Sequence, residues 1–321
     1  MCLPSSRNKP KARDLPRQKH FNGRRSLNIM RKTHCLTSIL LAFFLGHTAA
    51  ALAEIQPSAR LRLWDGPAPG APQNPEPEVA EEGGRVSRVS IPMLDVYLPP
   101  PDKANGQAII IFAGGAYRRL TSGPRGQGAA ERFLPQGIAV FSLKYRLRPP
   151  STDIIRDALA DAQRAVRLVR SRAEEWRIDP NRIGVVGFSA GSNLALHLAC
   201  NSDAGNPSAG DRIEKFSCRP DFIGLCCAWP FDEKISQFKI DGKVPPAFLA
   251  HCRDDKTAPF AFSEEIAAAW KRAGVPVHLQ PYDRGGHQAF SLPDETAKDW
   301  PDKLLAWMGD QPALSVKKRT P

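Results

Sequence analysis

The chain contains a serine whose neighbours suit nucleophilic chemistry. Ser189 stands in the pattern Gly-x-Ser-x-Gly, between Gly187 and Gly191. An apolar run precedes the pattern and a helical pattern follows it, so we expect a strand, a sharp turn and a helix, with the serine at the tip of the turn. The backbone N–H of Ala190 would then point from the first helical turn toward an oxyanion. The simpler alternative is a glycine-rich turn between a core strand and a core helix.

A nucleophilic serine needs a base, and the chain offers four histidines beyond residue 53. His197 belongs to the predicted helix after the serine, and His251 and His278 lie in apolar, strand-like runs. His287 follows a polar, glycine-rich loop after the last predicted strand, where an imidazole can reach over the edge of a sheet. We therefore predict His287 as the general base, against the alternative of an ordinary loop histidine.

The carboxylate that would hold this base is expected in the loop after the preceding predicted strand. Asp254 and Asp255 both stand there, at the carboxyl end of the strand, where catalytic groups gather in open α/β sheets. We favour Asp255, because the short turn that follows it can aim it inward, which leaves Asp254 to cap the loop. Asp232 is a weaker candidate. The alternative role of the aspartate pair is capping of the next helix.

A second oxyanion donor is expected after the apolar run 108–112. Small residues follow this run, and they let the backbone N–H groups of Gly115 and Ala116 approach a substrate oxygen. Tyr117 is predicted to line the mouth of the site and bind substrate. A tight turn needs glycines as well, so this motif has weight only together with the serine pattern.

Strands and helices that alternate along the chain would bring these groups together. Runs that are apolar at every position suit parallel strands covered on both faces. We predict strands within 86–98 and at 108–112, 137–145, 183–186, 222–228, 247–252 and 275–282. We predict helices at 153–176, 262–273 and 295–308, the first capped by Ser151 or Thr152. The expected fold class is α/β, with a doubly wound, mostly parallel sheet, helices on both faces and a minimal cap.

The composition predicts four segments. Residues 1–53 are interpreted as an N-terminal extension and signal peptide, with Met30 as a possible start, an apolar core at 36–45 and cleavage near Ala53. Residues 54–84 are predicted to be a Pro/Gly-rich linker, residues 85–310 a catalytic domain and residues 311–321 a flexible basic tail. We therefore expect a periplasmic or extracellular protein without a stable membrane anchor, an uncleaved N-terminal anchor being the alternative.

Charge and cysteines limit the partners. The net charge is +12, but residues 1–53 hold ten Lys/Arg and one acid, which leaves 35 and 32, or +3, for the remainder. We therefore expect no nucleic-acid partner. The spacing of the cysteines matches no metal site, and we expect neither a metal nor another cofactor. Cys200 and Cys218 flank a polar loop and could pair in an oxidising compartment.

Several segments together resemble the bacterial α/β-hydrolases related to acetylxylan esterases. They are AIIIFAGGAYRRL, GIAVFSLKYRL, the stretch from DAQRAV to GFSAGSNLA, FLAHCRDDKTAP and RGGHQAF, in matching order from about residue 86 to 308. The resemblance implies a Ser-His-Asp triad and an oxyanion hole, formed by Ser189, His287 and Asp255 and by Gly115, Ala116 and Ala190. Such relatives usually have Pro-Gly-Gly-Gly-Tyr where this chain has Ala-Gly-Gly-Ala-Tyr at 113–117.

The resulting expectation is a secreted serine esterase that removes short acyl groups from carbohydrate such as acetylated xylan, or from a small ester. The preference for acetyl comes from the resemblance. Residues 231–244 are few and polar, too small for a large lid, and an open cleft suits a polymer better than a long lipid chain. The alternatives are a peptidase or a dienelactone-hydrolase-like enzyme on the same fold, and a binding protein whose catalysis has lapsed.

Overall fold

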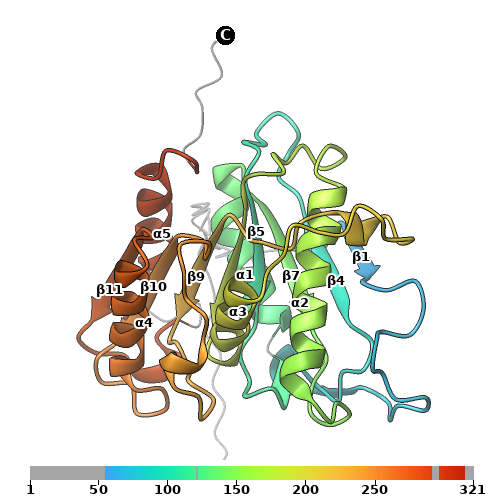
Figure 1. Cartoon of the computed structure of the whole chain (residues 1–321), viewed down its shortest axis with the longest axis horizontal. Helices are drawn as coiled ribbons and strands as arrows, with labels where there is room; N and C mark the ends of the chain where they lie inside the picture. The colour runs from blue at the N-terminus through green and yellow to red at the C-terminus, as the bar shows by residue number, and fades with distance from the viewer. Residues whose placement is uncertain (1–54, 121, 291–295, 315–321) are drawn as a thin grey trace, which may run out of the picture. The chain divides into compact units, whose positions relative to one another are not determined.

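Continuous apolar runs form the centre of an eight-stranded sheet in the computed structural model, which describes residues 55–120, 122–290 and 296–314 (Figure 1). Strands β5 (Ala108–Phe112), β8 (Ile183–Phe188) and β10 (Ala247–Cys252) are buried at every residue. The other strands of this sheet are β1 (Ala59–Arg62), β4 (Met93–Tyr97), β7 (Ala139–Lys144), β9 (Phe222–Cys226) and β11 (Val277–Tyr282). Their order is β1-β4-β7-β5-β8-β9-β10-β11.

The sheet is parallel from β7 to β11, whereas β4 runs antiparallel to both of its neighbours. Chain order reverses around β5, which pairs with β7 on one side and β8 on the other. The carboxyl ends of strands at such a reversal form the usual ligand crevice of an open α/β sheet. A second sheet is small and joins β2 (Val79–Glu81), β3 (Arg85–Ser87) and β6 (Arg119–Leu120).

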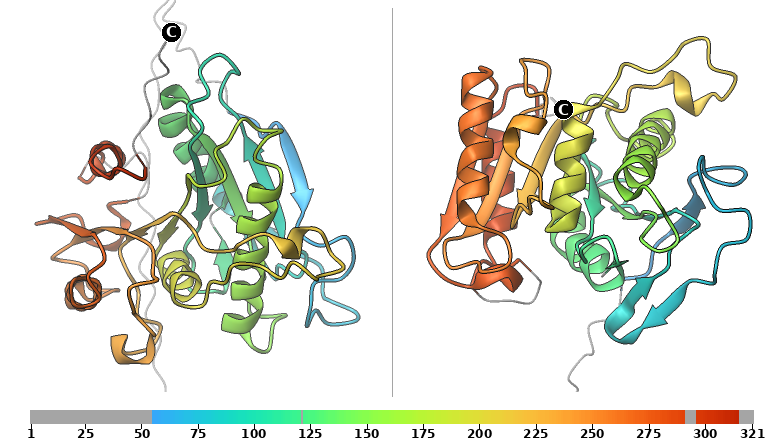
Figure 2. Two further views of the ribbon diagram at one scale, coloured as in Figure 1. Left: turned by 45° about the horizontal axis from the view of Figure 1, so that its top comes forward. Right: turned by 60° about the horizontal axis from the view of Figure 1, so that its bottom comes forward.

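Helices cover both faces of the large sheet (Figure 2). On one face lie α2 (Ile154–Ser171), α3 (Ala190–Cys200) and α4 (Phe260–Arg272), whose buried residues belong to the same core as Ile110 of β5. On the other face lie α1 (Ser122–Phe133) and α5 (Trp300–Gly309), which pack with Ile109 and Ile111. Successive side chains of β5 point to opposite faces of the sheet, so this strand contributes residues to two hydrophobic cores. The predicted doubly wound α/β class is confirmed.

Short 3₁₀ helices complete the fold: η1 (Glu82–Gly84), η2 (Leu134–Gln136), η3 (Ile213–Lys215), η4 (Ile235–Gln237) and η5 (Gly286–Gln288). All residues of the connection from β9 to β10 are described. This connection contains the short helix η4 and no helix longer than that. The cap over the sheet edge is therefore minimal, as predicted.

The predicted cap of α2 was wrong. Asp153 is the N-cap residue, and its side chain accepts a hydrogen bond from the backbone N–H of Arg156 at 3.3 Å. The hydroxyl of Ser151 instead donates to Asp157 at 2.8 Å. Asp153 caps the helix because it directly precedes the first helical residue, where a short side chain reaches the free N–H groups of the first turn.

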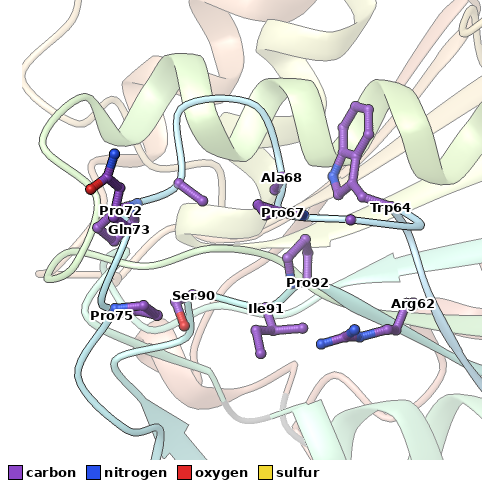
Figure 3. Close-up of a pocket in the computed structure, with 12 residues that line it drawn as sticks. Arg62, Trp64, Pro67, Ala68, Pro72, Gln73, Pro75, Ser90, Ile91 and Pro92 are labelled. Carbon is purple, nitrogen blue, oxygen red and sulfur yellow. The ribbon is translucent and has the colours of Figure 1, made fainter.

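The segment predicted as a linker is part of the folded domain, so the predicted boundary at residue 85 was wrong. β1 pairs with β4, Leu63 is 1% exposed, and the indole N–H of Trp64 donates to Asp161 of α2 at 3.2 Å. The following proline-rich loop encloses a pocket of about 250 Å³ with Ile91 and neighbouring residues (Figure 3). Proline-rich composition therefore marks an irregular but packed segment here.

The predicted tail is also partly ordered. Leu314 is 2% exposed, and its carbonyl accepts hydrogen bonds from Gln107 at 2.7 Å and Arg182 at 2.8 Å. Residues 315–321 and the predicted signal peptide lie outside the described residues. Cys200 and Cys218 are free thiols, so the structure does not form the predicted pair. Across the described ranges, no helix combines the length and the apolar character that a membrane span requires.

Candidate active site

Crowding between β8 and α3 shapes the turn that carries Ser189. Ser189 has φ 52° and ψ −118°, a backbone conformation that most residues avoid. A Cβ on Gly187 would lie 2.2 Å from the carbonyl oxygen of Gly191, and one on Gly191 would lie 2.0 Å from that of Phe112. Both glycines are therefore required for the strand and helix to approach this closely, and the serine stands at the turn between them.

The structure brings His287 and Asp255 to this serine. The Nε2 atom of His287 lies 2.8 Å from Ser189 Oγ, and its Nδ1 atom lies 2.7 Å from Asp255 Oδ2. His287 belongs to η5, which follows β11, and Asp255 lies in the turn after β10. Three side chains from the carboxyl ends of three strands thus form one hydrogen-bonded line.

Asp254 contacts a different loop from the one that it was predicted to cap. Its carboxylate accepts hydrogen bonds from the backbone N–H groups of Gly285 at 3.2 Å and Gly286 at 2.8 Å. These two glycines directly precede His287, and both have positive φ values. Asp254 therefore fixes the loop that carries the imidazole, while Asp255 contacts the imidazole itself.

Asp255 is held as a carboxylate. Its Oδ1 atom accepts from the backbone N–H groups of Thr257 at 2.8 Å and Ala258 at 2.9 Å. Burial opposes its ionisation, but hydrogen bonds from His251 and His287 outweigh burial and lower its pKa below the usual range. A negative charge that persists beside His287 can stabilise an imidazolium.

Sequence reasoning missed His251. Its side chain is fully buried, and its Nε2 atom lies 3.2 Å from Asp255 Oδ2 and 3.0 Å from the carbonyl oxygen of Ala258. Both neighbours can only accept, so Nε2 carries the proton and Nδ1 accepts the hydroxyl hydrogen of Ser263 at 2.7 Å. The spacing of four residues from Asp255 was the available signal, but it becomes a contact only because the chain turns back after β10.

The turn after β5 places free backbone donors beside Ser189. A Cβ on Gly114 would lie 3.1 Å from Ser189 Cβ, and one on Gly115 would lie 2.0 Å from the carbonyl oxygen of Arg119. Gly115 and Ala116 have φ values of 133° and 54°. Within the described ranges, the N–H groups of Gly115, Ala116 and Ala190 donate to no other residue. Donors left free at this point can receive a substrate oxyanion.

The predicted position of the Tyr117 side chain was wrong. Tyr117 is 0% exposed, and its ring packs against Tyr145 and Phe231. Its hydroxyl donates to Asn193 of α3 at 2.8 Å. The positive φ of Tyr117, 57°, accompanies this inward position. Tyr117 therefore supports the turn from below and does not line the cleft.

A cleft of about 740 Å³ opens above Ser189 and His287. Trp229 and Phe231 line it, with ring centroids 5.0 Å apart, and both are half-buried. Asp232, the weaker candidate for the acid, also lines this cleft, and no contact joins it to His287. Over the described ranges, no group of three or more His, Cys, Asp or Glu side chains could hold a metal ion.

Comparisons with known proteins agree with this geometry. The BD-FAE family matches residues 94–221. Among solved structures, an acetyl ester-xyloside bifunctional hydrolase from Caldicellulosiruptor lactoaceticus has a TM-score of 0.66 and 29% identity, and the match covers 80% of this chain and 97% of that one. The chain has the α/β-hydrolase fold.

Two curated relatives of this α/β-hydrolase carry related names. An acetylxylan esterase from Xylanibacter ruminicola is 29% identical over 205 residues, which cover 58% of this chain and 42% of the relative. An endo-1,4-beta-xylanase B from Butyrivibrio fibrisolvens is 28% identical over 237 residues, which cover 65% and 36%. The α/β-hydrolase thus spans less than half the length of either relative. The predicted resemblance to acetylxylan esterases is confirmed, and the relatives support carboxylic-ester hydrolysis as the reaction class.

Proposed function

We propose that this α/β-hydrolase is a serine carboxylic-ester hydrolase that removes short acyl groups, acetyl foremost, from carbohydrate. One observation carries the proposal: Ser189 Oγ, both ring nitrogens of His287 and Asp255 Oδ2 form a continuous line of contacts of 2.8 and 2.7 Å. This geometry fits a hydroxyl activated by a base that a carboxylate orients.

The proposed reaction has two halves. Ser189 Oγ attacks the ester carbonyl carbon while His287 Nε2 takes its proton, and Asp255 stabilises the imidazolium. The tetrahedral oxyanion accepts hydrogen bonds from the free N–H groups of the turn after β5 and of Ala190. His287 then gives the proton to the alcohol that leaves. In the second half, His287 deprotonates a water that attacks the acyl-enzyme, and Ser189 recovers its proton as the acid departs.

Two features support a short acyl group on a carbohydrate. The minimal cap leaves the cleft open, which favours a bulky, polar alcohol portion over a long acyl chain. Trp229 and Phe231 give the cleft an aromatic wall, and aromatic rings pack against the apolar faces of sugars. The names of the relatives point the same way.

The experiment compares kcat/KM for 4-nitrophenyl acetate, butyrate and octanoate, and measures acetate release from acetylated xylo-oligosaccharide. We expect turnover to fall as the acyl chain lengthens. Ser189→Ala should lower kcat by about 10⁴-fold or more, because the nucleophile is lost. An organophosphonate probe should label Ser189 in the folded protein. Equal or faster hydrolysis of the octanoate would reject the short-acyl proposal, and failure to label Ser189 would favour a binding protein without catalysis.

We also propose that the protein is exported, on the basis of the basic and apolar segments of residues 1–53. Expression of the full chain in a bacterium should deliver a mature protein to the periplasm or medium, with Glu54 as its first residue. Recovery of the uncleaved chain from the cytoplasm would contradict this proposal.

A further inference from the structure

The cleft above Ser189 is lined by an excess of positive charge. Four guanidinium groups and two carboxylates line it: Arg85, Arg118, Arg119, Arg148, Glu81 and Asp232. With a neutral His287, four positive and two negative groups give the lining a formal charge of +2. The cleft lining is therefore more basic than residues 54–321 as a whole, which hold 35 basic and 32 acidic groups.

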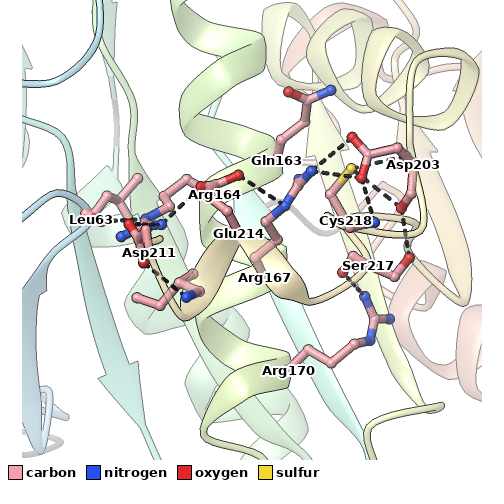
Figure 4. A network of polar contacts seen from close by, with 12 residues as sticks. Leu63, Gln163, Arg164, Arg167, Arg170, Asp203, Asp211, Glu214, Ser217 and Cys218 are labelled. Carbon is pink, nitrogen blue, oxygen red and sulfur yellow. Dashed lines mark hydrogen bonds and ion pairs between the residues drawn. The ribbon is translucent and has the colours of Figure 1, made fainter. Parts of the chain in front are cut away.

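Three of these arginines have no partner in the described part of the chain. The side chains of Arg118, Arg119 and Arg148 are exposed, and they form no hydrogen bond or ion pair with any described residue. The arginines of α2 differ. Arg164, Arg167 and Arg170 each pair with an acid of the loop between α3 and β9. Figure 4 shows the three arginines along the helix, with Arg167 joined to Asp203. The fold therefore satisfies its structural arginines and leaves those of the cleft available to a ligand.

The backbone fixes these arginines next to the predicted oxyanion turn. The N–H groups of Arg118 and Arg119 both donate to the carbonyl oxygen of Gly115, at 3.0 and 3.2 Å. The N–H of Arg148 donates to the carbonyl oxygen of Tyr117 at 2.8 Å. The backbone of these arginines therefore lies beside the turn that is expected to bind the acyl carbonyl, and the arginines line the same cleft as Ser189.

Arg85 joins them through the small sheet. Ser87 of β3 lies opposite Arg119 of β6, and Arg85 lies two residues from Ser87 on the same face of the strand. The Nε–H of Arg85 donates to the carbonyl oxygen of Glu82 at 3.0 Å, which orients the guanidinium. Its other N–H groups donate to no residue in the described part of the chain. Arg85 and Arg119 thus share one face of this sheet.

We propose that this cleft selects esters of acidic carbohydrate, in which the acylated sugar or its neighbour bears a carboxylate. The inference rests on the proposed esterase function. Guanidinium groups bind carboxylates through paired, charge-assisted hydrogen bonds, and several of them at one wall favour a sugar acid over a neutral sugar. A sulfate ester would offer the same negative charge, so the experiment separates the two.

The test compares kcat/KM for deacetylation of three substrates of equal length: an acetylated oligogalacturonide, its carboxyl-reduced neutral counterpart and a sulfated, acetylated neutral oligosaccharide. At low ionic strength we expect the uronide to be preferred over the neutral substrate by about tenfold, which corresponds to about 1.4 kcal/mol. At about 1 M salt the Debye length falls to about 3 Å, and the preference should approach unity. Equal rates for the uronide and the neutral substrate at low salt would overturn the proposal. A stronger preference for the sulfated substrate would overturn the assignment of a carboxylate.

Two variants connect the preference to the arginines. Arg118→Gln and Arg148→Gln should each reduce the ratio of uronide to neutral kcat/KM by about two- to fivefold, as expected for one exposed ion pair. The matched control is Arg272→Gln, an exposed arginine at the end of α4 that removes the same charge away from the cleft. An unchanged ratio in both cleft variants, or an equal reduction in the control, would refute the proposal.

A binding measurement separates this proposal from the esterase function. Titration calorimetry with the Ser189→Ala protein and a non-acetylated oligogalacturonide needs no turnover. We expect binding at low salt that weakens in Arg118→Gln, and weaker binding of the carboxyl-reduced oligomer. If the wild-type protein hydrolysed no ester but this pattern appeared, the function would fail and the anion site would stand. If esters were hydrolysed but the uronide did not bind more tightly, only the anion site would fail.

Discussion

Two histidines meet one carboxylate at the centre of the site, and they differ in what they can do. His287 reaches both Ser189 and Asp255, whereas His251 is buried behind Asp255 and reaches no other residue of the line. The proton on His251 Nε2 is fixed by its two acceptors. His251 is therefore a positioning residue, which orients Asp255 through this hydrogen bond.

Replacement of His251 should show this role. His251→Phe removes one donor to Asp255 Oδ2 and leaves the hydroxyl of Ser263 without its partner. We expect kcat for a short ester to fall by about 10- to 100-fold with little change in KM, because Asp255 loses its fixed orientation but the cleft is unchanged. Urea unfolding should show a loss of about 1–3 kcal/mol.

His278→Phe is the matched control for this change. His278 lies on the adjacent strand β11, exposed and stacked on Phe248 with ring centroids 5.5 Å apart. Its replacement should leave kcat unchanged. An equal loss of kcat in both variants, or a rise in KM alone for His251→Phe, would contradict the positioning role.

The lowered pKa of Asp255 makes a prediction about stability. The folded protein ionises Asp255 at a lower pH than the unfolded chain does, so the carboxylate stabilises the fold above its unfolded pKa of about 4. This contribution is lost as the pH falls from there toward the folded value. At pH 7, Asp255→Asn should be less stable than wild type by about 1.5–3 kcal/mol, since charge-assisted bonds are lost.

Urea unfolding at several pH values measures this difference. The gap between wild type and Asp255→Asn should narrow below about pH 4. The control is Asp283→Asn, whose side chain is 94% exposed and whose contact with Arg253 is 3.8 Å long. A gap for Asp255→Asn that stayed constant from pH 7 to about pH 3 would contradict the charge-based explanation.

Residue patterns in the sequence predicted which side chains meet at the site. The predictions were wrong where the position of a side chain depends on the backbone conformation. Ser189, Asp255 and His287 follow three predicted strands, so the sheet edge alone brings them together. The position of Tyr117 was predicted wrongly because three successive residues with positive φ, 115–117, accompany the inward position of its ring, and composition does not reveal such a turn. The contact between His251 and Asp255 was not predicted, because it depends on how tightly the chain turns after β10.

At the scale of elements, α2 holds the long loop between α3 and β9 through a row of arginines (Figure 4). Arg164 is the most buried of them, with 1% of its side chain exposed. It pairs with Asp211 and Glu214, donates to the carbonyl oxygen of Leu63 and lies over the ring of Trp64. One side chain thus joins this loop, the helix and the segment after β1.

Arg164→Met should weaken the attachment of α2 to the loop between α3 and β9 and to the segment after β1. The two acids are partly exposed and can be hydrated, so we expect a loss of about 1–3 kcal/mol, less than for a fully buried ion pair. Limited proteolysis should cut the loop of residues 201–221 faster. The control, Arg172→Met, removes a more exposed arginine just after α2 that pairs with Glu175. Unchanged proteolysis in Arg164→Met would show that the loop does not depend on this pair.

Strands were predictable where burial is continuous and not where one edge meets solvent. The runs 108–112 and 247–252 match β5 and β10 to the residue, because both faces of these strands are covered. β1 reads Ala-Arg-Leu-Arg and is mostly exposed, so its sequence has the composition of a loop. Only its pairing with β4 makes it a strand. Because prolines follow β1 in the sequence, the whole segment was wrongly predicted to be a linker.

At the scale of the whole molecule, the segment from residue 55 to residue 84 therefore belongs to the same structural unit as the large sheet. β1 covers the edge of β4, and Glu81 of β2 lines the cleft. An uncovered edge strand offers its backbone groups to other chains. The site and the sheet thus both extend into a segment that composition alone assigns to a linker.

A protein of residues 85–314 should consequently be much less stable than one of residues 55–314, although both keep Ser189, His287 and Asp255. The shorter protein loses the burial of Leu63, worth about 1.5–3 kcal/mol, and the hydrogen bonds that Arg164 and Trp64 make across α2, worth about 1 kcal/mol each. Against a typical total of about 5–15 kcal/mol, this loss should appear as a lower urea midpoint and as aggregation through β4. Equal urea midpoints and equal ester turnover for the two proteins would show that β1 does not stabilise the domain. The predicted domain boundary at residue 85 would then hold for stability.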